Sequence, residues 1–534
     1  MLKLKFEVNS NVVNVLLALY FCLFLNINFF GYVFNNVGIV GTQSVLFVVN
    51  IAVVSFCIHY LIFNIICIPY LFKFLVILML LISSLANFYM KEYGVFIDID
   101  MIRNVFETNT SEAFDLVNLK FILNFVIFGV IPSIFISVQK ITYGKKFIKD
   151  KVLGILGSLV FVVLSASIFY KQYAFFLRNN REIRKLINPE NWIYSTFKYC
   201  KKTYFTNREF IVLDNNVTRI KNKNRTVFIL VVGETARASN FSLNGYERKT
   251  NPLLEKEDIV NFDNFYSAGT STAISVPAMF SVYDRNDFDV NKAKYTENVM
   301  DLIEKSGMDV LWLENDGSCK NVCERIQTEM IDKESSKKYC NDDGCFDEIM
   351  IDKMMNYINS TNNDVFIVLH TMGSHGPSYY KRYPEKFDVF GPTCKTIDLQ
   401  NCERQNIVNA YDNTILYTDY FLSTVINKLK TLDNTNTGLI YVSDHGESLG
   451  ENGLYLHGMP YKIAPRFQTH VPMFVWISDF ARENMRVSYD CLSRVQHNKF
   501  SHDNLFHSLL GLLSIQTKVY NSNYDIFYMC VKSH

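Results

Sequence analysis

The sequence has little charge, and the charge that it has is balanced. Charged residues make up 20% of the chain, and 53 Lys and Arg nearly cancel 52 Asp and Glu, which leaves a net charge of +1. Nucleic-acid-binding proteins depend on an excess of basic residues that neutralise phosphates, so this class is excluded. Intrinsic disorder is excluded as well, because 49% of the residues are hydrophobic and the net charge is low.

The first third of the chain lacks charge over long windows. No Asp, Glu, Lys or Arg occurs from Val8 to Phe72, a run that holds two membrane helices of about 20 residues each, with a turn between Gly31 and Gly41. Three further charge-free windows each have the length of one crossing: Phe74–Met90, Phe121–Gln139 and Val152–Tyr170. The sequence therefore predicts a domain of five transmembrane helices over residues 1–175.

The basic residues predict the orientation of these helices. Lys3 and Lys5 precede the first helix, Lys73 lies between the second and third, and the loop after the fourth is rich in Lys from Lys140 to Lys151. Cytoplasmic loops carry an excess of Lys and Arg, so the N-terminus is predicted to be cytoplasmic. After an odd number of crossings, the chain beyond about residue 170 is then exported.

Two polar segments adjoin the membrane helices. Near residues 98–118, Asn104, Thr108 and Glu112 recur at every fourth position, so a helix places them on one face. The spacing allows either a solvated surface helix or a polar face that binds a lipid headgroup above the membrane. Residues 176–214 are rich in Lys, Arg, Tyr and Phe, which predicts a juxtamembrane linker that is partly an interfacial helix, although an ordinary linker fits nearly as well.

Residues 215–534 alternate between strand-like and helical segments. Four β-branched runs each end in a polar cluster: Val227–Val232, Asp309–Leu313, Val365–Leu369 and Gly438–Val442. Helical stretches such as Asn406–Lys430 lie between them. This alternation predicts an α/β domain with a mostly parallel sheet and helices on both faces. Ligands bind beyond the carboxyl ends of such strands, so the polar clusters mark the expected site.

The cysteines agree with an exported second half. Of the twelve, three lie in the predicted membrane helices, where they act as small apolar residues: Cys22, Cys57 and Cys67. Three close pairs favour disulfides over a zinc knuckle, because no two pairs have zinc-finger spacing with accompanying His: Cys319/Cys323, Cys340/Cys345 and Cys394/Cys402. Cys491 and Cys530 are candidates for a fourth bridge, and Cys200 is expected to be unpaired.

The strand-end clusters contain candidate metal ligands. Asp444-His445 offers a carboxylate and an imidazole, which suit Zn²⁺, and Glu234 follows another strand. Each of these alone is more typical of a hydrogen-bonded turn.

Other motifs in this half of the sequence carry hydroxyl and imidazole groups. The segment Gly269–Ala273 (GTSTA) carries hydroxyls that can act as nucleophiles near a metal, or can cap a helix. His375 lies in GSHGP and His457 in YLHG, and each alone is more typical of a structural residue. The conjunction of all these groups favours a catalytic site.

Together these segments closely resemble the phosphoethanolamine transferases of Gram-negative inner membranes, including the colistin-resistance type that modifies lipid A. That family belongs to the alkaline phosphatase/sulfatase superfamily. The matching segments are VVGETARASNFSLNGY, GTSTAISVPAMFS, HTMGSHGPSYYKRYP, SDHGESLGENGLYLHGMPY and SHDNLFHSLLG. With five predicted membrane helices ahead of them, the resemblance covers nearly the whole chain.

The resemblance implies a role for each candidate residue. The ligands of one catalytic zinc are expected to be Glu234, Thr272, Asp444 and His445. Thr272, rather than Thr270, matches the family's nucleophile. His375 and His457 match a pair that contacts the phosphoethanolamine or a second zinc, and either is the expected general acid or base. Residues expected to bind the substrate also include Lys320, which matches a phosphate-binding position, and Asn104, Thr108 and Glu112.

The resemblance also implies a reaction. Phosphoethanolamine passes from phosphatidylethanolamine to a lipid A phosphate through a phospho-Thr272 intermediate, which lowers susceptibility to polymyxin. The enzyme is expected to be a monomer in the inner membrane with a periplasmic catalytic domain. The alternatives are a phosphoglycerol transferase, a sulfatase-like membrane hydrolase, transfer to another envelope acceptor, and a non-catalytic scaffold with a structural metal.

One departure from the family concerns the nucleophile's loop. Relatives commonly have a Cys on each side of the nucleophile, where this chain has Ala268 and Ala278. The loss of both partners together is what the loss of one disulfide predicts. The loop is therefore expected to be less constrained, with packing at Pro277 in compensation.

Overall fold

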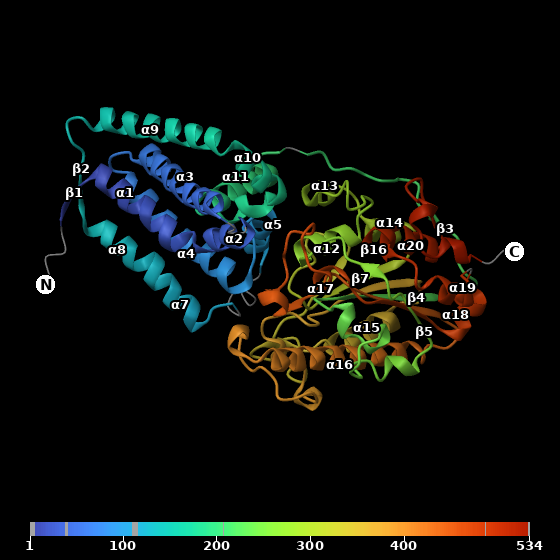
Figure 1. Cartoon of the computed structure of the whole chain (residues 1–534). Helices are drawn as coiled ribbons and strands as arrows, with labels where there is room; N and C mark the ends of the chain where they lie inside the picture. Colours follow the sequence, from blue (N-terminus) through green and yellow to red (C-terminus); the bar gives the residue numbers. More distant parts are fainter. Residues whose placement is uncertain (1–5, 38–40, 109–115, 207, 486, 532–534) are drawn as a thin grey trace. The chain divides into compact units, whose positions relative to one another are not determined.

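The computed structural model describes residues 6–37, 41–108, 116–206, 208–485 and 487–531, and this chain divides into two compact units (Figure 1). The first unit contains the residues up to Ile102 and Val117–Lys201, and the second contains Arg103–Leu116 and the chain from Lys202 onward. These bounds differ from the predicted ones at 175 and 214. The reason is that α11 (Glu190–Tyr204) is tied to the first unit, where Trp192 Nε1 donates a hydrogen bond to Ser83 Oγ at 3.0 Å.

Long apolar helices build the first unit. Among the described residues, four segments are long and apolar enough to cross a membrane: α3 (Thr42–Ile66), α4 (Phe72–Tyr93), the continuous Leu119–Val138 and α9 (Phe147–Ile168). Leu119–Val138 consists of α7 (Leu119–Phe125), the π-helical turn η2 (Val126–Val130) and α8 (Ile131–Val138). Four spans, or five if a bent pair of helices is one span, therefore cover the charge-free windows of the sequence.

The bent pair differs from the prediction. Ser10–Leu25, which is α1 (Ser10–Tyr20) with the π-helical turn η1 (Phe21–Leu25), meets α2 (Ile27–Val37) at an angle of 62°. The predicted turn beginning at Gly31 is wrong, because α2 runs through this glycine. The bend lies at Asn26, whose side-chain amide donates to the carbonyls of Phe21 and Asn188. A side chain inserted in this way interrupts the helical hydrogen-bond ladder.

A seven-stranded sheet forms the centre of the second unit. Its order is β5 (Ile259–Asn261), β15 (Met473–Ile477), β12 (Asn436–Ser443), β4 (Thr226–Gly233), β11 (Val365–His370), β7 (Asp309–Glu314) and β8 (Gln327–Met330). All neighbouring pairs are parallel except the two that involve β15. The four strands expected from the sequence, β4, β7, β11 and β12, are adjacent in the parallel part.

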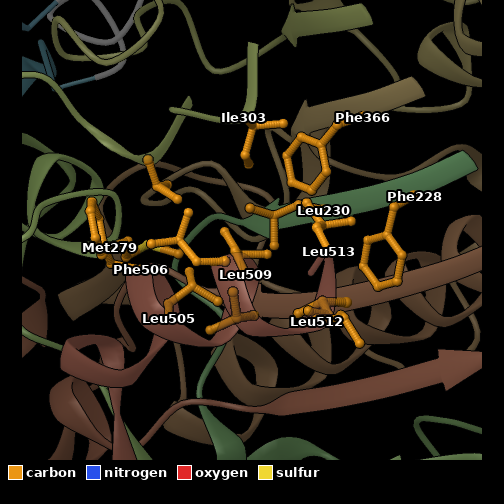
Figure 2. Close-up of a cluster of buried hydrophobic side chains, with 14 of the residues drawn as sticks. Phe228, Leu230, Met279, Ile303, Phe366, Leu505, Phe506, Leu509, Leu512 and Leu513 are labelled. Carbon is orange, nitrogen blue, oxygen red and sulfur yellow. The ribbon is translucent and has the colours of Figure 1, made fainter. Parts of the chain in front are cut away.

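Apolar layers cover both faces of the sheet. On β4, Phe228 and Leu230 point into one core cluster, and Val227 and Ile229 point into the other. The helices α12 (Thr272–Met279), α14 (Val299–Lys305) and α20 (Leu505–Leu512) pack on the first cluster (Figure 2). The helices α15 (Ile349–Ser360) and α16 (Arg404–Leu429) pack on the second. Burial on both sides explains why β4 is continuously apolar.

Short elements complete the two units. In the first unit they are β1 (Glu7–Asn9), β2 (Lys140–Thr142) and α10 (Tyr170–Asn179), and α5 (Ile99–Glu107) continues from the first unit into the second. In the second they are β3 (Thr218–Arg219), β6 (Phe265–Tyr266), α13 (Val290–Lys294), β9 (Cys340–Asn341), β10 (Gly344–Cys345), β13 (Ser448–Leu449), β14 (Tyr455–Leu456), α17 (Arg466–Thr469), α18 (Asp479–Asn484), α19 (Tyr489–Val495), β16 (Phe500–Ser501) and β17 (Ile515–Gln516).

The packing of α14 on the sheet predicts the cost of a cavity. Ile303 is fully buried beside Phe366 and Leu230 (Figure 2), and Ile463 is 44% exposed. We expect Ile303→Ala to lower the free energy of unfolding by about 2–5 kcal/mol, because the removed methyl and methylene groups leave a void. Ile463→Ala should change it by less than about 0.5 kcal/mol. Urea unfolding followed by tryptophan fluorescence measures both, and equal effects would contradict this packing.

Candidate active site

The carboxyl ends of β4 and β12 bring three predicted metal ligands together. The two strands are parallel and Ser443 pairs with Gly233, so Glu234 and the Asp444-His445 pair follow at the same edge. His445 Nε2 lies 3.6 Å from Glu234 Oε1 and 3.3 Å from Asp444 Oδ2. All three side chains are fully buried. Such a group of atoms, with ligand atoms within 4.8 Å of one another, can hold a metal ion.

Thr272 stands at the first position of α12 and faces this group. Its Oγ1 lies 3.2 and 3.3 Å from the two carboxylate oxygens of Glu234, and 3.4 Å from His445 Nε2. The structure thus brings the four residues expected at the zinc into one cluster. The position at the start of a helix also directs backbone N–H groups towards an anion bound there.

The chemistry of these donor atoms fits a zinc ion. His445 Nδ1 lies 2.9 Å from the carbonyl oxygen of Gly446, which can only accept, so Nδ1 carries the proton and Nε2 has a free electron pair. Burial lowers the pKa of His445 well below its usual range, which keeps the ring neutral. Asp444 Oδ2 is buried and accepts no hydrogen bond from any described residue. One imidazole and two carboxylates around a hydroxyl are a donor set that Zn²⁺ accepts.

The backbone around Glu234 is held in a strained conformation. Thr235 has φ 52°, a region that residues with a β-branched side chain rarely occupy. It is fixed there by Tyr411 OH, which donates to Thr235 O at 2.7 Å, and by its own N–H, which donates to Asp444 Oδ1. Gly373, at φ 49°, packs so closely that a Cβ would lie 2.8 Å from Glu234 O. Strain of this kind is typical of functional sites.

The two remaining histidines lie beside the cluster. The ring centres of His445 and His457 are 4.4 Å apart, and those of His375 and His457 are 6.1 Å apart. His457 Nδ1 lies 2.9 Å from Glu447 Oε2, and Tyr379 OH donates to the other oxygen of Glu447 at 2.6 Å. Burial lowers the pKa of His375 well below its usual range. His375 is therefore neutral, and His457 is oriented by a carboxylate.

A cavity of about 340 Å³ opens onto Thr272, partly to solvent. Its wall consists of Asn104, Glu107, Thr108, Ser271, Thr272, Ala273, Lys320, His375 and His457, all of which belong to the second unit. The expected substrate-binding residues therefore meet at one place, except Glu112, which lies outside the described residues. The helix of the polar stretch, α5, ends at Glu107, so Thr108 follows it rather than lying within it.

Comparison with known proteins agrees with this geometry. A family model for phosphoethanolamine transferases EptA/EptB matches residues 55–204, and a sulfatase model matches residues 226–515. Phosphoethanolamine transferase EptA of Escherichia coli K12 is 38% identical over 525 residues, which cover 97% of this chain and 96% of the relative. The chain belongs to the phosphoethanolamine transferase family.

This transferase is also similar to a second sequence relative and to a solved structure. Phosphatidylethanolamine transferase Mcr-1 of Escherichia coli is 38% identical over 453 residues, covering 80% of this chain and 83% of Mcr-1. The structure of the integral membrane lipooligosaccharide phosphoethanolamine transferase A of Neisseria meningitidis superposes with a TM-score of 0.96, at 37% identity, and covers 99% of this chain and all of that one. The transferase is thus a membrane protein with a soluble second domain, and it belongs to the alkaline phosphatase/sulfatase superfamily.

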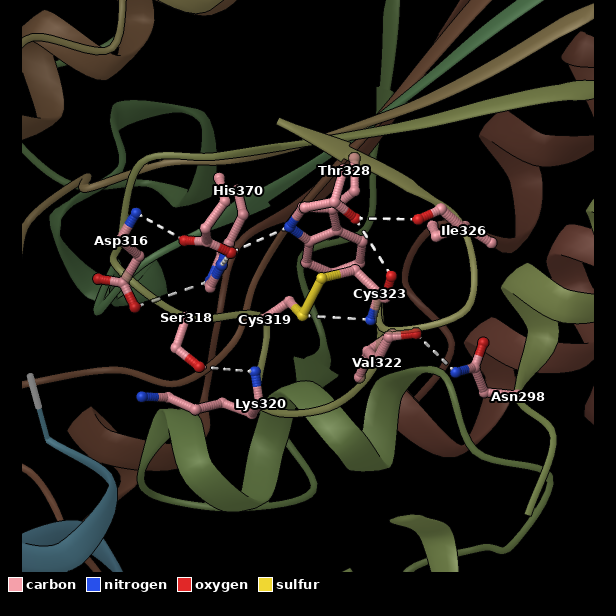
Figure 3. The surroundings of a disulfide bond; sticks show 12 residues. Asn298, Asp316, Ser318, Cys319, Lys320, Val322, Cys323, Ile326, Thr328 and His370 are labelled. Carbon is pink, nitrogen blue, oxygen red and sulfur yellow. Dashed lines mark hydrogen bonds and ion pairs between the residues drawn. A yellow bond between two sulfur atoms is a disulfide. The ribbon is translucent and has the colours of Figure 1, made fainter. Parts of the chain in front are cut away.

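Disulfides flank the transferase's phosphate-binding candidate. Bonds join the three predicted pairs, Cys319–Cys323, Cys340–Cys345 and Cys394–Cys402, and a fourth joins Cys491–Cys530. Cys200 is free. Lys320 lies inside the first of these loops with φ 48°, and its side chain is mostly buried (Figure 3). The Lys320 ammonium group donates a hydrogen bond to the carbonyl oxygen of Glu107 at 3.4 Å.

Sequence reasoning gave no role to two groups of residues near the site. Glu447 lies within the SDHGE segment, and its distance along the chain from Asp444 does not predict that it orients His457. Glu314 and His370 end β7 and β11, and they meet at 2.7 Å although 56 positions separate them. Their signal was the polar cluster that follows each strand, Glu-Asn-Asp and His-Thr-Met.

The loop that carries Thr272 is held by hydrogen bonds. Ala268 N donates to His502 Nδ1 at 3.1 Å, and Arg285 Nε donates to Ala268 O at 3.0 Å. His502 Nε2 in turn donates to Ser443 O, directly before Asp444. The expected loss of constraint at Ala268 is therefore offset by a histidine that bridges the nucleophile's loop and β12.

His502 makes the folding stability of the transferase depend on pH, and the direction of this dependence follows from its pKa. Burial lowers its pKa from 6.5 to about 4. Below pH 6.5 this histidine binds a proton in the unfolded chain but stays neutral in the folded chain. Its contribution to the free energy of unfolding is therefore fully present above pH 6.5 and is lost as the pH falls towards 4. We expect a loss of about 2 kcal/mol from this group between about pH 7.5 and 5.

The substitution His502→Gln isolates this contribution. Urea unfolding at the two pH values should show a pH dependence that is smaller than that of the wild type by about this amount. An identical pH dependence in both proteins would contradict the neutral, buried state of His502.

Proposed function

We propose that this transferase moves phosphoethanolamine from phosphatidylethanolamine to a phosphate of lipid A through a covalent intermediate on Thr272. The observation that carries the proposal is the position of the Thr272 hydroxyl, within 3.4 Å of Glu234 and His445 at the floor of the cavity. An acceptor that contains lipid A is supported by the name of a more distant relative, Kdo(2)-lipid A phosphoethanolamine 7''-transferase of Salmonella typhimurium, 27% identical over 76% of this chain.

Glu234, Thr272, Asp444 and His445 would hold one zinc ion. Bound zinc supplies Lewis acidity, which lowers the pKa of a coordinated hydroxyl and neutralises charge on a phosphoryl group. A structural zinc site is normally closed by four strong protein ligands, and the weakly coordinating hydroxyl of Thr272 is an unusual choice for one of them. This argues against a non-catalytic scaffold.

In the first half-reaction, the Thr272 oxygen attacks the phosphorus of phosphatidylethanolamine in line. The bond from phosphorus to the glycerol oxygen breaks, so diacylglycerol leaves and phosphoethanolamine stays on Thr272. Lys320, in the cavity wall, would stabilise the negative charge on the equatorial oxygens. The proton of the Thr272 hydroxyl passes to His457, which Glu447 holds in place, and His457 then gives it to the leaving glycerol oxygen. His375, which is neutral, would act as a base rather than as an acid.

In the second half-reaction, a phosphate oxygen of lipid A attacks the same phosphorus. The bond to Thr272 breaks, and the proton that the attacking phosphate loses passes through a histidine to the Thr272 oxygen. His375 and His457 line the cavity and are the candidates for this exchange. Both substrates are lipids, which explains why the catalytic domain is tied to membrane helices.

The membrane unit supports a topology with five spans. Counting α1 and α2 as one bent span gives five crossings, with the N-terminus in the cytoplasm and the catalytic domain in the periplasm. The enzyme acts in the inner membrane as a monomer. Phosphoethanolamine on lipid A adds a positive group to an anionic phosphate, which lowers the affinity of the cell surface for cationic peptides such as polymyxin.

Replacing Thr272 tests the nucleophile. Thr272→Ala should reduce transfer more than about 10³-fold, because no other group replaces the lost oxygen. Thr272→Ser, the matched control, keeps a hydroxyl and should retain measurable transfer. Release of labelled diacylglycerol and mass spectrometry of lipid A measure the two half-reactions. Transfer by a folded, membrane-inserted Thr272→Ala protein would exclude the proposed intermediate.

The donor is tested in the same assay with a matched lipid. Labelled phosphatidylglycerol in place of phosphatidylethanolamine should release no diacylglycerol above background. Release from phosphatidylglycerol alone would identify the enzyme as a phosphoglycerol transferase instead. Intact-protein mass spectrometry should also show a phosphoethanolamine adduct on wild-type protein without acceptor, and no adduct on Thr272→Ala.

A further inference from the structure

A second group of metal-binding atoms lies on the other side of Glu234. Glu234, Asp316 and His370 each offer one ligand atom, and these atoms lie within 4.8 Å of one another. Asp316 follows β7, and His370 is the last residue of β11, so the group spans three neighbouring strand ends. All three side chains are buried. None of these three residues lines the cavity at Thr272.

His370 is oriented as a metal ligand. Its Nδ1 lies 2.7 Å from Glu314 Oε2, and this carboxylate also accepts from Trp312 Nε1. The N–H groups of Asp316 and Gly317 donate to Glu314 Oε1, so Glu314 cannot turn away. A carboxylate that fixes Nδ1–H of a histidine is the usual partner of a metal-bound imidazole.

The remaining nitrogen of His370 points at Asp316. His370 Nε2 lies 4.0 Å from Asp316 Oδ2 and makes no hydrogen bond in the described part of the chain. A separation of 4.0 Å is too long for a hydrogen bond. Two ligands that bind the same ion at about 2.0–2.2 Å each lie at most about 4.4 Å apart, so this separation leaves room for an ion between them. A fully buried polar atom without a hydrogen bond, directed at two carboxylates, therefore points to a missing cation.

The charge of the surroundings favours the same occupant. The carboxylates of Glu234, Glu314 and Asp316 surround the His370 ring. An anionic pocket of this kind attracts a divalent cation, because the cation carries twice the charge of a monovalent one. Buried carboxylates are stable when they are paired with a positive group or coordinate a metal.

We propose that Glu234, Asp316 and His370 bind a divalent cation of their own, with Glu234 shared between this ion and the one at Thr272. One imidazole nitrogen with carboxylate oxygens selects zinc or manganese rather than magnesium or calcium. The proposal rests on the proposed role of Glu234 as a zinc ligand. It adds a site separate from the His375 and His457 pair.

Metal stoichiometry tests the proposal directly. A chelator removes all metal from the full-length protein in detergent, which is then reloaded with Zn²⁺ alone and dialysed. Elemental mass spectrometry gives the number of zinc ions bound per chain. We expect His370→Gln to lose about one zinc per chain relative to the wild type, because the glutamine amide keeps the contact with Glu314 but binds zinc poorly. Asp316→Asn, which hardly changes the shape of the side chain, should lose the same ion. It serves as the test if His370→Gln folds poorly.

Two control variants separate this site from others. His497→Gln alters an exposed histidine that contacts Asp263, and it should keep the wild-type zinc count. His445→Gln should lose the zinc at Thr272. If His445→Gln keeps the full count while His370→Gln loses one ion, the zinc site of the proposed function is wrong and the new site stands.

Anomalous diffraction at the zinc edge locates the ion. Crystals of the zinc-loaded protein should show a peak bounded by Glu234, Asp316 and His370, and His370→Gln crystals should lack it. Equal zinc counts in the wild type, His370→Gln and Asp316→Asn, with no peak at this position, would overturn the proposal. His370 Nε2 would then carry a proton that pairs with Asp316.

Discussion

The whole site depends on one constraint, which is the burial of negative charge at the carboxyl ends of neighbouring strands. Glu234 and Asp444 are withdrawn from water at the ends of β4 and β12, and His445 places an electron pair between them. Such an arrangement is costly without a cation, because the interior offers little solvation to a carboxylate. Buried carboxylates of this kind are retained where they take part in binding or catalysis.

The sheet makes this arrangement possible by holding the strand ends in register. Parallel pairing of β12 with β4, and of β4 with β11, brings residues from distant parts of the chain to one edge. The strained Thr235 and the close packing of Gly373 then fix Glu234 between two strand ends. Two apolar layers, one on each face, keep the sheet rigid enough to bear that strain. The exact placement of the candidate metal ligands thus originates in packing far from them.

The sequence predicted those features that depend on local pattern. Charge-free windows mark the membrane helices, and the apolar runs of β4, β7, β11 and β12 mark the parallel sheet, because burial on both faces leaves no polar position. The strand-end position of Asp444 follows from the same pattern. Features that depend on distant partners were not predicted. The bend at Asn26 requires Asn188, and the meeting of Glu314 with His370 requires β7 and β11 to be neighbours.

Hydrogen bonds from His502 and Arg285 hold the Thr272 loop at Ala268, whereas a disulfide closes the Lys320 loop, so the two loops respond differently to thiols. The Thr272 loop contains no sulfur, so a reductant leaves its backbone contacts intact. The loop around Lys320 is closed by Cys319–Cys323, and reduction opens it. Before the cysteines are oxidised, the Thr272 loop therefore already has its contacts, whereas the loop around Lys320 is closed only when Cys319 and Cys323 form their bond.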